Sequence, residues 1–473
     1  MHKLALLSIL IASTVFADRP PNLLILQTDE HHYNTLSCYG SKTVKTPNID
    51  WLAKHGALCT SFYATSPVCS PSRAALVSGR YPQNTPVVNN NIPLDGKIVT
   101  FAEVLRRRGY ATGYAGKWHL DGNGKPQWAP KRKFGFEDNR FMFNRGHWKK
   151  FEDTPNGPRV GARKNGKPNY NLDGADEKTF STDWLTNKAI DFIDTNKNKS
   201  FCYMVAYPDP HGPNTVRAPY DTMYKPKNVY IPPSLQKALA QVPKWATKEN
   251  KLTAGHLRKI MPAYYGMVRL IDDNIGRIIE TLRKNNILEN TMIVFTSDHG
   301  DLCGEHCRLN KGNPYEGSAR IPFVLYFPKN VKGGQVIPQA LSCVDFFPTA
   351  MTLMGHADAL KDKGVVIEGR DASPLFNGAE DVEWNDISFL RMGGWVSAVS
   401  DRYKVVYSAS DKPWFFDLEK DPTEMNNLFG KPEYNEIIKS MTTQLLKYMQ
   451  MYNDPHGKDG STVRAAMEAE LGK

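Results

Sequence analysis

Residues 22–27 read Asn-Leu-Leu-Ile-Leu-Gln, a short and nearly all-apolar stretch that is followed by the acidic pair Asp29-Glu30. Residues 291–296, Thr-Met-Ile-Val-Phe-Thr, have the same character and lead into Asp298-His299. Continuous apolar stretches of this length are typical of strands that are buried on both faces of a parallel sheet. We therefore predict two buried strands, each ending in a polar cluster.

Two further stretches follow the same pattern. Residues 110–115 run into Gly116-Lys117-Trp118-His119, and residues 201–207 run into Asp209-Pro210-His211. Helical patterns lie between the strands, most clearly at 264–282, where aliphatic residues recur at helical spacing. This alternation predicts an α/β fold in which helices flank a sheet. Ligands of such sheets bind beyond the carboxyl ends of the strands, so one site should collect these polar clusters.

The length of the chain and a change in its pattern predict two domains. A chain of 473 residues exceeds a usual single core. After about residue 380, residues 395–408 and 414–418 have the pattern of antiparallel strands, and a helical segment follows at 433–452. We expect a catalytic domain at 18–380 and a C-terminal subdomain at 381–473.

The start of the chain resembles a secretory signal peptide, which we assign to residues 1–17. It has a basic beginning, an apolar run from Leu4 to Phe16 and a small-residue cleavage site at Ala17. We therefore expect export, to the periplasm or to the medium. No other segment approaches the ~18 apolar residues of a membrane span, so we expect no membrane partner.

The net charge and the cysteines indicate less about the function of the chain. The chain carries 60 Lys and Arg against 49 Asp and Glu, a net charge of +11 that favours an anionic partner. No nucleic-acid-binding module is recognisable, so we expect no nucleic acid. Among the seven cysteines, Cys303 and Cys307 have no second pair that would complete a zinc site; packing and a local disulfide both remain open.

The two acidic clusters suggest a metal site. Asp29, Glu30, Asp298 and His299 bring three carboxylates and one imidazole from two strand ends. This donor set suits a hard cation, and we expect one calcium ion, with magnesium or manganese as the alternatives.

Residues 69–73 read Cys-Ser-Pro-Ser-Arg and continue with Leu76 and Ser78-Gly79-Arg80. Pro71 suits a first helical turn, which puts residue 69 at the positive end of a helix. The stretch resembles the maturation signature of the type I sulfatases, Cys-x-Pro-Ser-Arg-x-x-Leu-x-Thr/Ser-Gly-Arg, at every fixed position. The resemblance implies that a formylglycine-generating or anaerobic maturase enzyme oxidises Cys69 to formylglycine, whose hydrate is the nucleophile and a metal ligand.

The same resemblance implies roles for further residues. Arg73 would orient the hydrate, Lys117 would brace it and a sulfate oxygen, and His119 would remove a proton from it. His211 and Lys311 would contact the sulfate, and one of them would protonate the departing alcohol. Glu30 departs from the residue types more common at its family position.

The resemblance extends from residue 22 to about 430, through family-like stretches at 264–276, 344–349 and 416–422. It implies the alkaline-phosphatase-like α/β/α sandwich with a smaller C-terminal α+β domain. The implied function is hydrolysis of sulfate esters, and the +11 charge and the long loops at 121–182 and 208–256 favour a sulfated polysaccharide. Bacterial relatives suggest a carrageenan-type galactan first.

The residues expected to contact the glycan are Asn91, Arg145, His147 and Trp148. Two other functions remain open. A phosphate mono- or diester hydrolase of the same superfamily would often hold two metals, for which we see no second ligand set. A non-catalytic binder of sulfated glycans would not need the full set of catalytic residue types.

Overall fold

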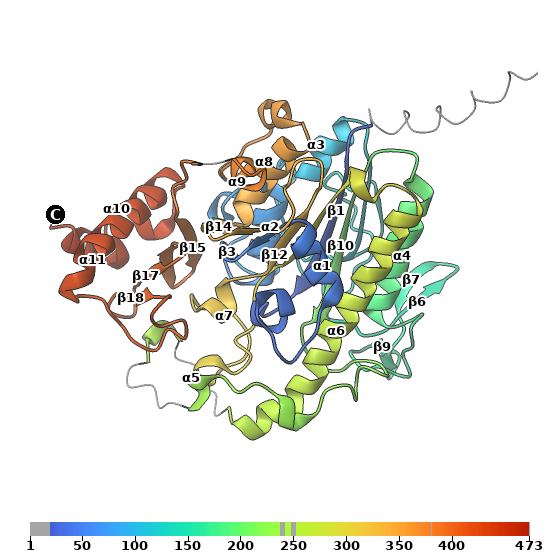
Figure 1. Cartoon of the computed structure of the whole chain (residues 1–473), viewed down its shortest axis with the longest axis horizontal. Helices are drawn as coiled ribbons and strands as arrows, with labels where there is room; N and C mark the ends of the chain where they lie inside the picture. The colour runs from blue at the N-terminus through green and yellow to red at the C-terminus, as the bar shows by residue number, and fades with distance from the viewer. Residues whose placement is uncertain (1–18, 237–241, 247–251, 380, 473) are drawn as a thin grey trace, which may run out of the picture.

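The computed structural model describes residues 19–236, 242–246, 252–379 and 381–472 (Figure 1). The predicted signal peptide lies outside these residues. Among the described helices, none is both long and apolar enough to cross a bilayer. All seven cysteines are free thiols, including Cys303 and Cys307.

The core of the molecule is an eight-stranded sheet with the order β13-β2-β12-β11-β1-β10-β4-β5. Five neighbouring strands are parallel: β1 (Asn22–Asp29), β4 (Ala111–Lys117), β5 (Asp138–Phe143), β10 (Phe201–Pro210) and β11 (Thr291–Ser297). Every residue of β1, β10 and β11 is buried, as the apolar stretches predict. One edge is mixed, because β12 (Phe323–Tyr326) runs antiparallel to both β11 and β2 (Ala57–Cys59), and β13 (Gln335–Ile337) pairs parallel with β2.

Helices cover both faces of this sheet. Leu24 and Leu26 of β1 belong to the core beneath α1 (Pro47–His55), α4 (Ser181–Asn196) and α6 (Ala254–Lys284). Leu23 and Ile25 belong to the opposite core, beneath α2 (Cys69–Ser78), α3 (Phe101–Arg107) and α8 (Cys343–Leu353). Successive strand residues point to opposite faces, so one apolar stretch supplies both cores. The fold is therefore the predicted α/β/α sandwich.

A smaller antiparallel sheet follows near the C-terminus, at the left of Figure 1. It contains β15 (Ser388–Met392), β16 (Trp395–Val399), β17 (Tyr403–Ser408) and β18 (Trp414–Asp417), and it packs against α10 (Asn435–Met451) and α11 (Thr462–Glu470). The buried Lys404 of β17 joins this sheet to α7 (Glu316–Ala319), since its ammonium lies 2.6 Å from Glu316 Oε1 and 2.8 Å from Glu424 Oε1.

The long segment at 121–182 contains two hairpins outside the central sheet. β6 (Phe151–Thr154) pairs with β7 (Gly157–Val160), and β8 (Arg163–Lys164) pairs with β9 (Lys167–Pro168). The remaining short elements are β3 (Phe62–Tyr63) with β14 (Leu341–Ser342), and the helices α5 (Pro233–Gln236) and α9 (Ser373–Phe376). The parallel strands β1, β4 and β10 end on one side of the sheet, where Asp29, Lys117 and Pro210 are their last residues.

Candidate active site

Cys69 is the first residue of α2, a helix whose ten residues are all buried. Its side chain is 2% exposed, and its sulfur lies 3.1 Å from His299 Nε2 and 3.6 Å from Lys117 Nζ. Pro71 occupies the first turn, where its missing N–H removes no helical hydrogen bond. The free amides and the dipole of the helix therefore favour negative charge at residue 69.

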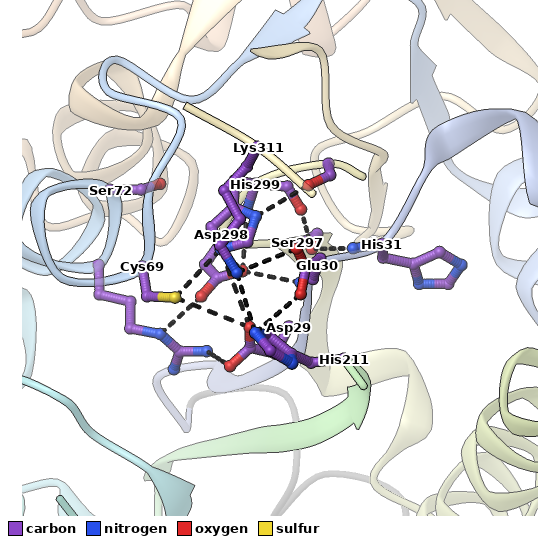
Figure 2. Close-up of polar contacts among 12 residues, drawn as sticks. Asp29, Glu30, His31, Cys69, Ser72, His211, Ser297, Asp298, His299 and Lys311 are labelled. Carbon is purple, nitrogen blue, oxygen red and sulfur yellow. Dashed lines mark hydrogen bonds and ion pairs between the residues drawn. The ribbon is translucent and has the colours of Figure 1, made fainter. Parts of the chain in front are cut away.

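Four residues bring donor atoms to within 4.8 Å of one another: Asp29, Cys69, Asp298 and His299 (Figure 2). Asp29 ends β1, and Asp298 and His299 directly follow β11, so the pairing of these two strands brings the donors together. His299 Nδ1 lies 2.9 Å from the carbonyl oxygen of Gly300, which fixes the ring and leaves Nε2 for the cluster. Two carboxylates and an imidazole fit a divalent cation, and an oxygen donor at residue 69 would fit a hard cation better than sulfur.

Glu30 takes a different direction. Its carboxylate lies 2.7 Å from His211 Nε2 and 3.0 Å from Lys311 Nζ, and it is not part of the four-residue group. The backbone of Glu30 is left-handed, with a φ of 60°, an uncommon conformation for a residue other than glycine. Metal binding by Glu30 thus stays a prediction, while the contacts link it to two sulfate-binding candidates.

Arg73 connects the cluster to the helix. Its Nε donates to Asp298 Oδ2 (2.9 Å), one Nη donates to Asp29 Oδ2 (3.3 Å), and the other donates to the carbonyl oxygen of Lys117 (2.6 Å). All of these groups are buried, so each carboxylate has a compensating charge. Arg73 therefore fixes both metal-ligand candidates relative to the helix that carries Cys69.

Two lysines and two imidazoles face the cluster. Lys117 Nζ contacts Asp29 Oδ2 and lies 2.9 Å from His147 Nε2, and Lys311 Nζ lies 2.9 Å from His211 Nε2. The rings of His147 and His211 are stacked with their centroids 3.3 Å apart. Asp29, His147 and His211 form a second group of close donors, but each imidazole Nε2 already faces an ammonium. This arrangement favours an anion between the lysines over a second cation.

His119 lies beside the start of α2. Its Nε2 is 3.0 Å from Asn91 Oδ1, and its carbonyl oxygen accepts a hydrogen bond from Ser70 Oγ (2.7 Å). Burial lowers the pKa of His119, which keeps the imidazole neutral at pH 7. His119 and Asn91 both have left-handed backbones, with φ values of 59° and 67°. Such conformations cost energy and cluster at functional sites.

The charges of the site act on Cys69 and on His299. Burial opposes ionisation of the Cys69 thiol, but Lys117, Lys311 and His299 outweigh it and hold the pKa well below its usual range. Burial lowers the pKa of His299, yet the neighbouring Asp298 carboxylate raises it to about 9. The lowered pKa of Cys69 shows that the cations outweigh the carboxylates at its sulfur, which favours an anionic group there.

The four predicted glycan-contacting residues lie in different environments. Asn91 and His147 contact the site as described, and Arg145 donates to the carbonyl oxygen of Asn123 (3.0 Å). Trp148 is only 3% exposed, and its ring packs against Tyr170 at 4.7 Å. In this conformation the indole of Trp148 supports the loop and offers no surface to a ligand.

The buried ion pair between Lys149 and Asp209 was not predicted from the sequence. Lys149 Nζ lies 2.6 Å from Asp209 Oδ1 and donates to the carbonyl oxygen of His211 (3.0 Å). Thr182 Oγ1 donates to the other carboxylate oxygen (2.5 Å). This pair ties the loop that carries His147 to the loop that carries His211. Asp209 lies at the end of a buried strand, a signal that pointed to it, whereas nothing in the sequence distinguishes Lys149 from a surface lysine.

Comparison with known proteins agrees with this geometry. The family model "Sulfatase" matches residues 21–356, and the model "N-sulphoglucosamine sulphohydrolase, C-terminal" matches residues 304–451. An N-acetylglucosamine-6-O-sulfatase of Bacteroides thetaiotaomicron is 27% identical, over 93% of this chain and 88% of its own length.

Two solved structures resemble the fold. One, described as a complex with its substrate D-glucosamine-2-N,6-O-disulfate, has a TM-score of 0.73 and 22% identity, and the match covers 93% of this chain and all of that one. The other, a complex with k-i-k-neocarrahexaose, has a TM-score of 0.66 and 24% identity, with 96% and 98% covered. At these identities, the structures show a shared fold.

Proposed function

Because this chain belongs to the sulfatase family of the alkaline phosphatase superfamily and is a sulfuric ester hydrolase, we propose that it removes sulfate from a sulfated polysaccharide or oligosaccharide. One observation carries the assignment of its centre. The thiol of Cys69 begins a buried helix, between a group of metal-type ligands and a pair of lysines. An anion that reaches residue 69 meets the helix dipole and both ammonium groups.

Two groups absent from the chain as translated would supply the central chemistry. Converted to formylglycine, residue 69 would offer a hydrated aldehyde as nucleophile, while a calcium ion held by Asp29, Asp298 and His299 would neutralise negative charge beside it. Arg73 keeps the two carboxylates of this site in place through its hydrogen bonds to both.

Lys117, His211 and Lys311 hold the sulfate. The two ammonium groups and the imidazole lie near residue 69, and the charge of the lysines favours the extra charge on the sulfate oxygens in the transition state. Glu30 holds Lys311 and His211 in one place through contacts of 3.0 and 2.7 Å. Lys311 or His211 gives the proton to the departing alcohol, which a carbohydrate hydroxyl needs because it is a poor leaving group.

His119 takes the proton at residue 69 that must leave before sulfate is released. A neutral imidazole is required for this step, and the lowered pKa of His119 provides it. The contact of Nε2 with Asn91 Oδ1 orients the ring.

The substrate proposal rests on charge and on relatives. The net charge of +11 and the long basic insertion at 121–182 suit a polyanionic chain. Our first candidate is a carrageenan-type sulfated galactan, supported by the fold shared with the protein that is bound to neocarrahexaose. The predicted signal peptide supports action in the periplasm or the medium.

A panel of sulfated oligosaccharides and a matched phosphate ester tests the proposal. The matured protein is incubated with each, and inorganic sulfate and phosphate are both measured. We expect sulfate from at least one glycan. Release of phosphate without sulfate would favour the phosphate ester hydrolase instead, and binding without any release would favour a non-catalytic glycan-binding protein.

A further inference from the structure

The insertion at 121–182 is rich in cations, and half of its carboxylates already form ion pairs. It contains 13 Lys and Arg against 8 Asp and Glu. Several of the acidic side chains form ion pairs with nearby cations: Glu137 with Lys133, Asp138 with Arg140, Glu152 with Arg159, and Asp153 with Lys188. These pairs leave a second set of cations without a carboxylate.

The cations of the insertion that make no ion pair with any residue that the structure describes include Lys125, Arg145, Arg163, Lys164 and Lys167. All but Arg145 are exposed, and Arg145 is half-buried. The adjacent carboxylate of Asp173 accepts a hydrogen bond from the backbone N–H of Arg163 (3.1 Å). Unpaired charges that crowd one surface repel one another, so their arrangement favours an external anion.

Tyr170 connects these cations to the active site. Its ring centroid lies 6.1 Å from that of His147, and the ammonium of Lys125 lies 5.0 Å above it. Lys167 precedes Tyr170 by only three residues, which limits their separation to roughly 10 Å along the chain. Lys164 is directly opposite Lys167 in the β8–β9 hairpin. Positive charge therefore continues from the sulfate-holding residues, across a half-exposed aromatic ring, to the tip of this hairpin.

We propose that these five cations and Tyr170, together the basic platform, bind the sulfated sugars that flank the ester being cleaved. The proposal rests on the proposed function and deepens it, since it assigns a substrate of several sulfated units. A chain with one ester between Lys117 and Lys311 would pass His147 and reach Tyr170, whose ring can pack against a sugar. The flanking sulfates would then meet Lys125, Arg145 and the hairpin cations.

Direct binding of fluorescein-labelled dextran sulfate tests the platform without turnover. The test variant is Arg163→Gln/Lys164→Gln/Lys167→Gln, in a hairpin whose paired residues are all exposed. The control is Lys329→Gln/Lys332→Gln/Lys363→Gln, which removes the same charge at exposed positions. Lys329 and Lys332 follow β12, which is antiparallel to β11, so they lie at the end of the sheet away from the active site.

We expect the hairpin variant to bind dextran sulfate roughly 10- to 100-fold more weakly at low salt, and the slope of log Kd against log salt to fall by about two. The control should bind as the wild type does. Dextran sulfate should also compete with an aryl sulfate in the wild type and compete less well in the hairpin variant. Unchanged binding, an equal loss in the control, or DNA bound as tightly as dextran sulfate would overturn the proposal.

The proposed function fails separately. If the protein released no sulfate from any ester, that function would be contradicted, and the binding measurements would still decide whether the platform holds a sulfated chain. If the hairpin variant kept both normal aryl sulfate turnover and normal affinity for dextran sulfate, the platform would be wrong and the proposed function would stand.

Discussion

Replacing Lys311 by methionine should lower kcat more for sulfate esters with a poor leaving group than for esters with a good one. Lys311 Nζ lies 3.0 Å from Glu30 Oε1 and 2.9 Å from His211 Nε2, and its side chain is 15% exposed. Burial lowers the pKa of this amine, but Glu30, Cys69 and Asp29 together outweigh burial and raise it, so the ammonium stays charged at neutral pH. Loss of one preorganised donor to developing charge costs about 10²–10³ in kcat. We therefore expect that loss for a carbohydrate sulfate.

The stability of the variant should change much less than its activity. Glu30 keeps His211 at 2.7 Å, so the Lys311→Met change leaves no carboxylate without a partner, and about 1–2 kcal/mol is the expected cost. Methionine preserves most of the length of the side chain, and Lys332→Met serves as the control at an exposed position.

The assay compares kcat for a carbohydrate sulfate with kcat for an aryl sulfate whose phenol is acidic. An acidic phenol leaves without a proton, so the aryl ester should lose clearly less than the carbohydrate ester. Equal losses for the two esters, or a loss below about 5-fold for both, would refute proton donation and charge stabilisation by Lys311.

Three further changes test other parts of the site and the fold. His147→Gln should raise KM for sulfated substrates, because the ring lies beside Lys117. The thermal midpoint of unfolding should stay nearly unchanged, because the residue is half-exposed. A lower midpoint with an unchanged KM would instead indicate a structural role. Asp298→Asn should weaken calcium binding roughly 10- to 100-fold by calorimetry, and unchanged affinity would remove Asp298 from the ligand set. Burial raises the pKa of Glu424 to about 7 from an ordinary 4.5. The wild type should therefore lose stability relative to Glu424→Gln as pH rises from 5 to 7.5, by on the order of 1–3 kcal/mol in the free energy of urea unfolding. A stability difference that stays constant with pH would contradict the raised pKa.

The strands and the convergence of the polar clusters could be predicted from the sequence. The stretches at 22–27 and 291–296 had to be buried on both faces, and parallel neighbours end on the same side of a sheet. These two facts place Asp29, Asp298 and His299 on the same side of the sheet, and the pairing of β1 with β11 then brings them together. Pro71 likewise places Cys69 at the start of a helix, because proline is tolerated in a first helical turn.

Other features could not be predicted, because no local sequence pattern determines their geometry. The left-handed backbone of Glu30 directs its carboxylate to Lys311 and His211, and a strand-end acid gives no sign of that choice. Lys149 has the surroundings of a surface lysine in the sequence, yet the fold of the insertion buries it against Asp209. The antiparallel β12 was missed for a similar reason, since short strands have no periodicity that reveals their direction.

The central claim, that residue 69 becomes the nucleophile, is tested most directly by the mass of the peptide that contains it. The protein is produced with and without a formylglycine-forming enzyme, and the converted fraction is compared with the rate of sulfate release. We predict that the rate rises in proportion to the converted fraction and is nearly lost in Cys69→Ser. Full activity in protein that carries only the unmodified thiol would contradict the claim.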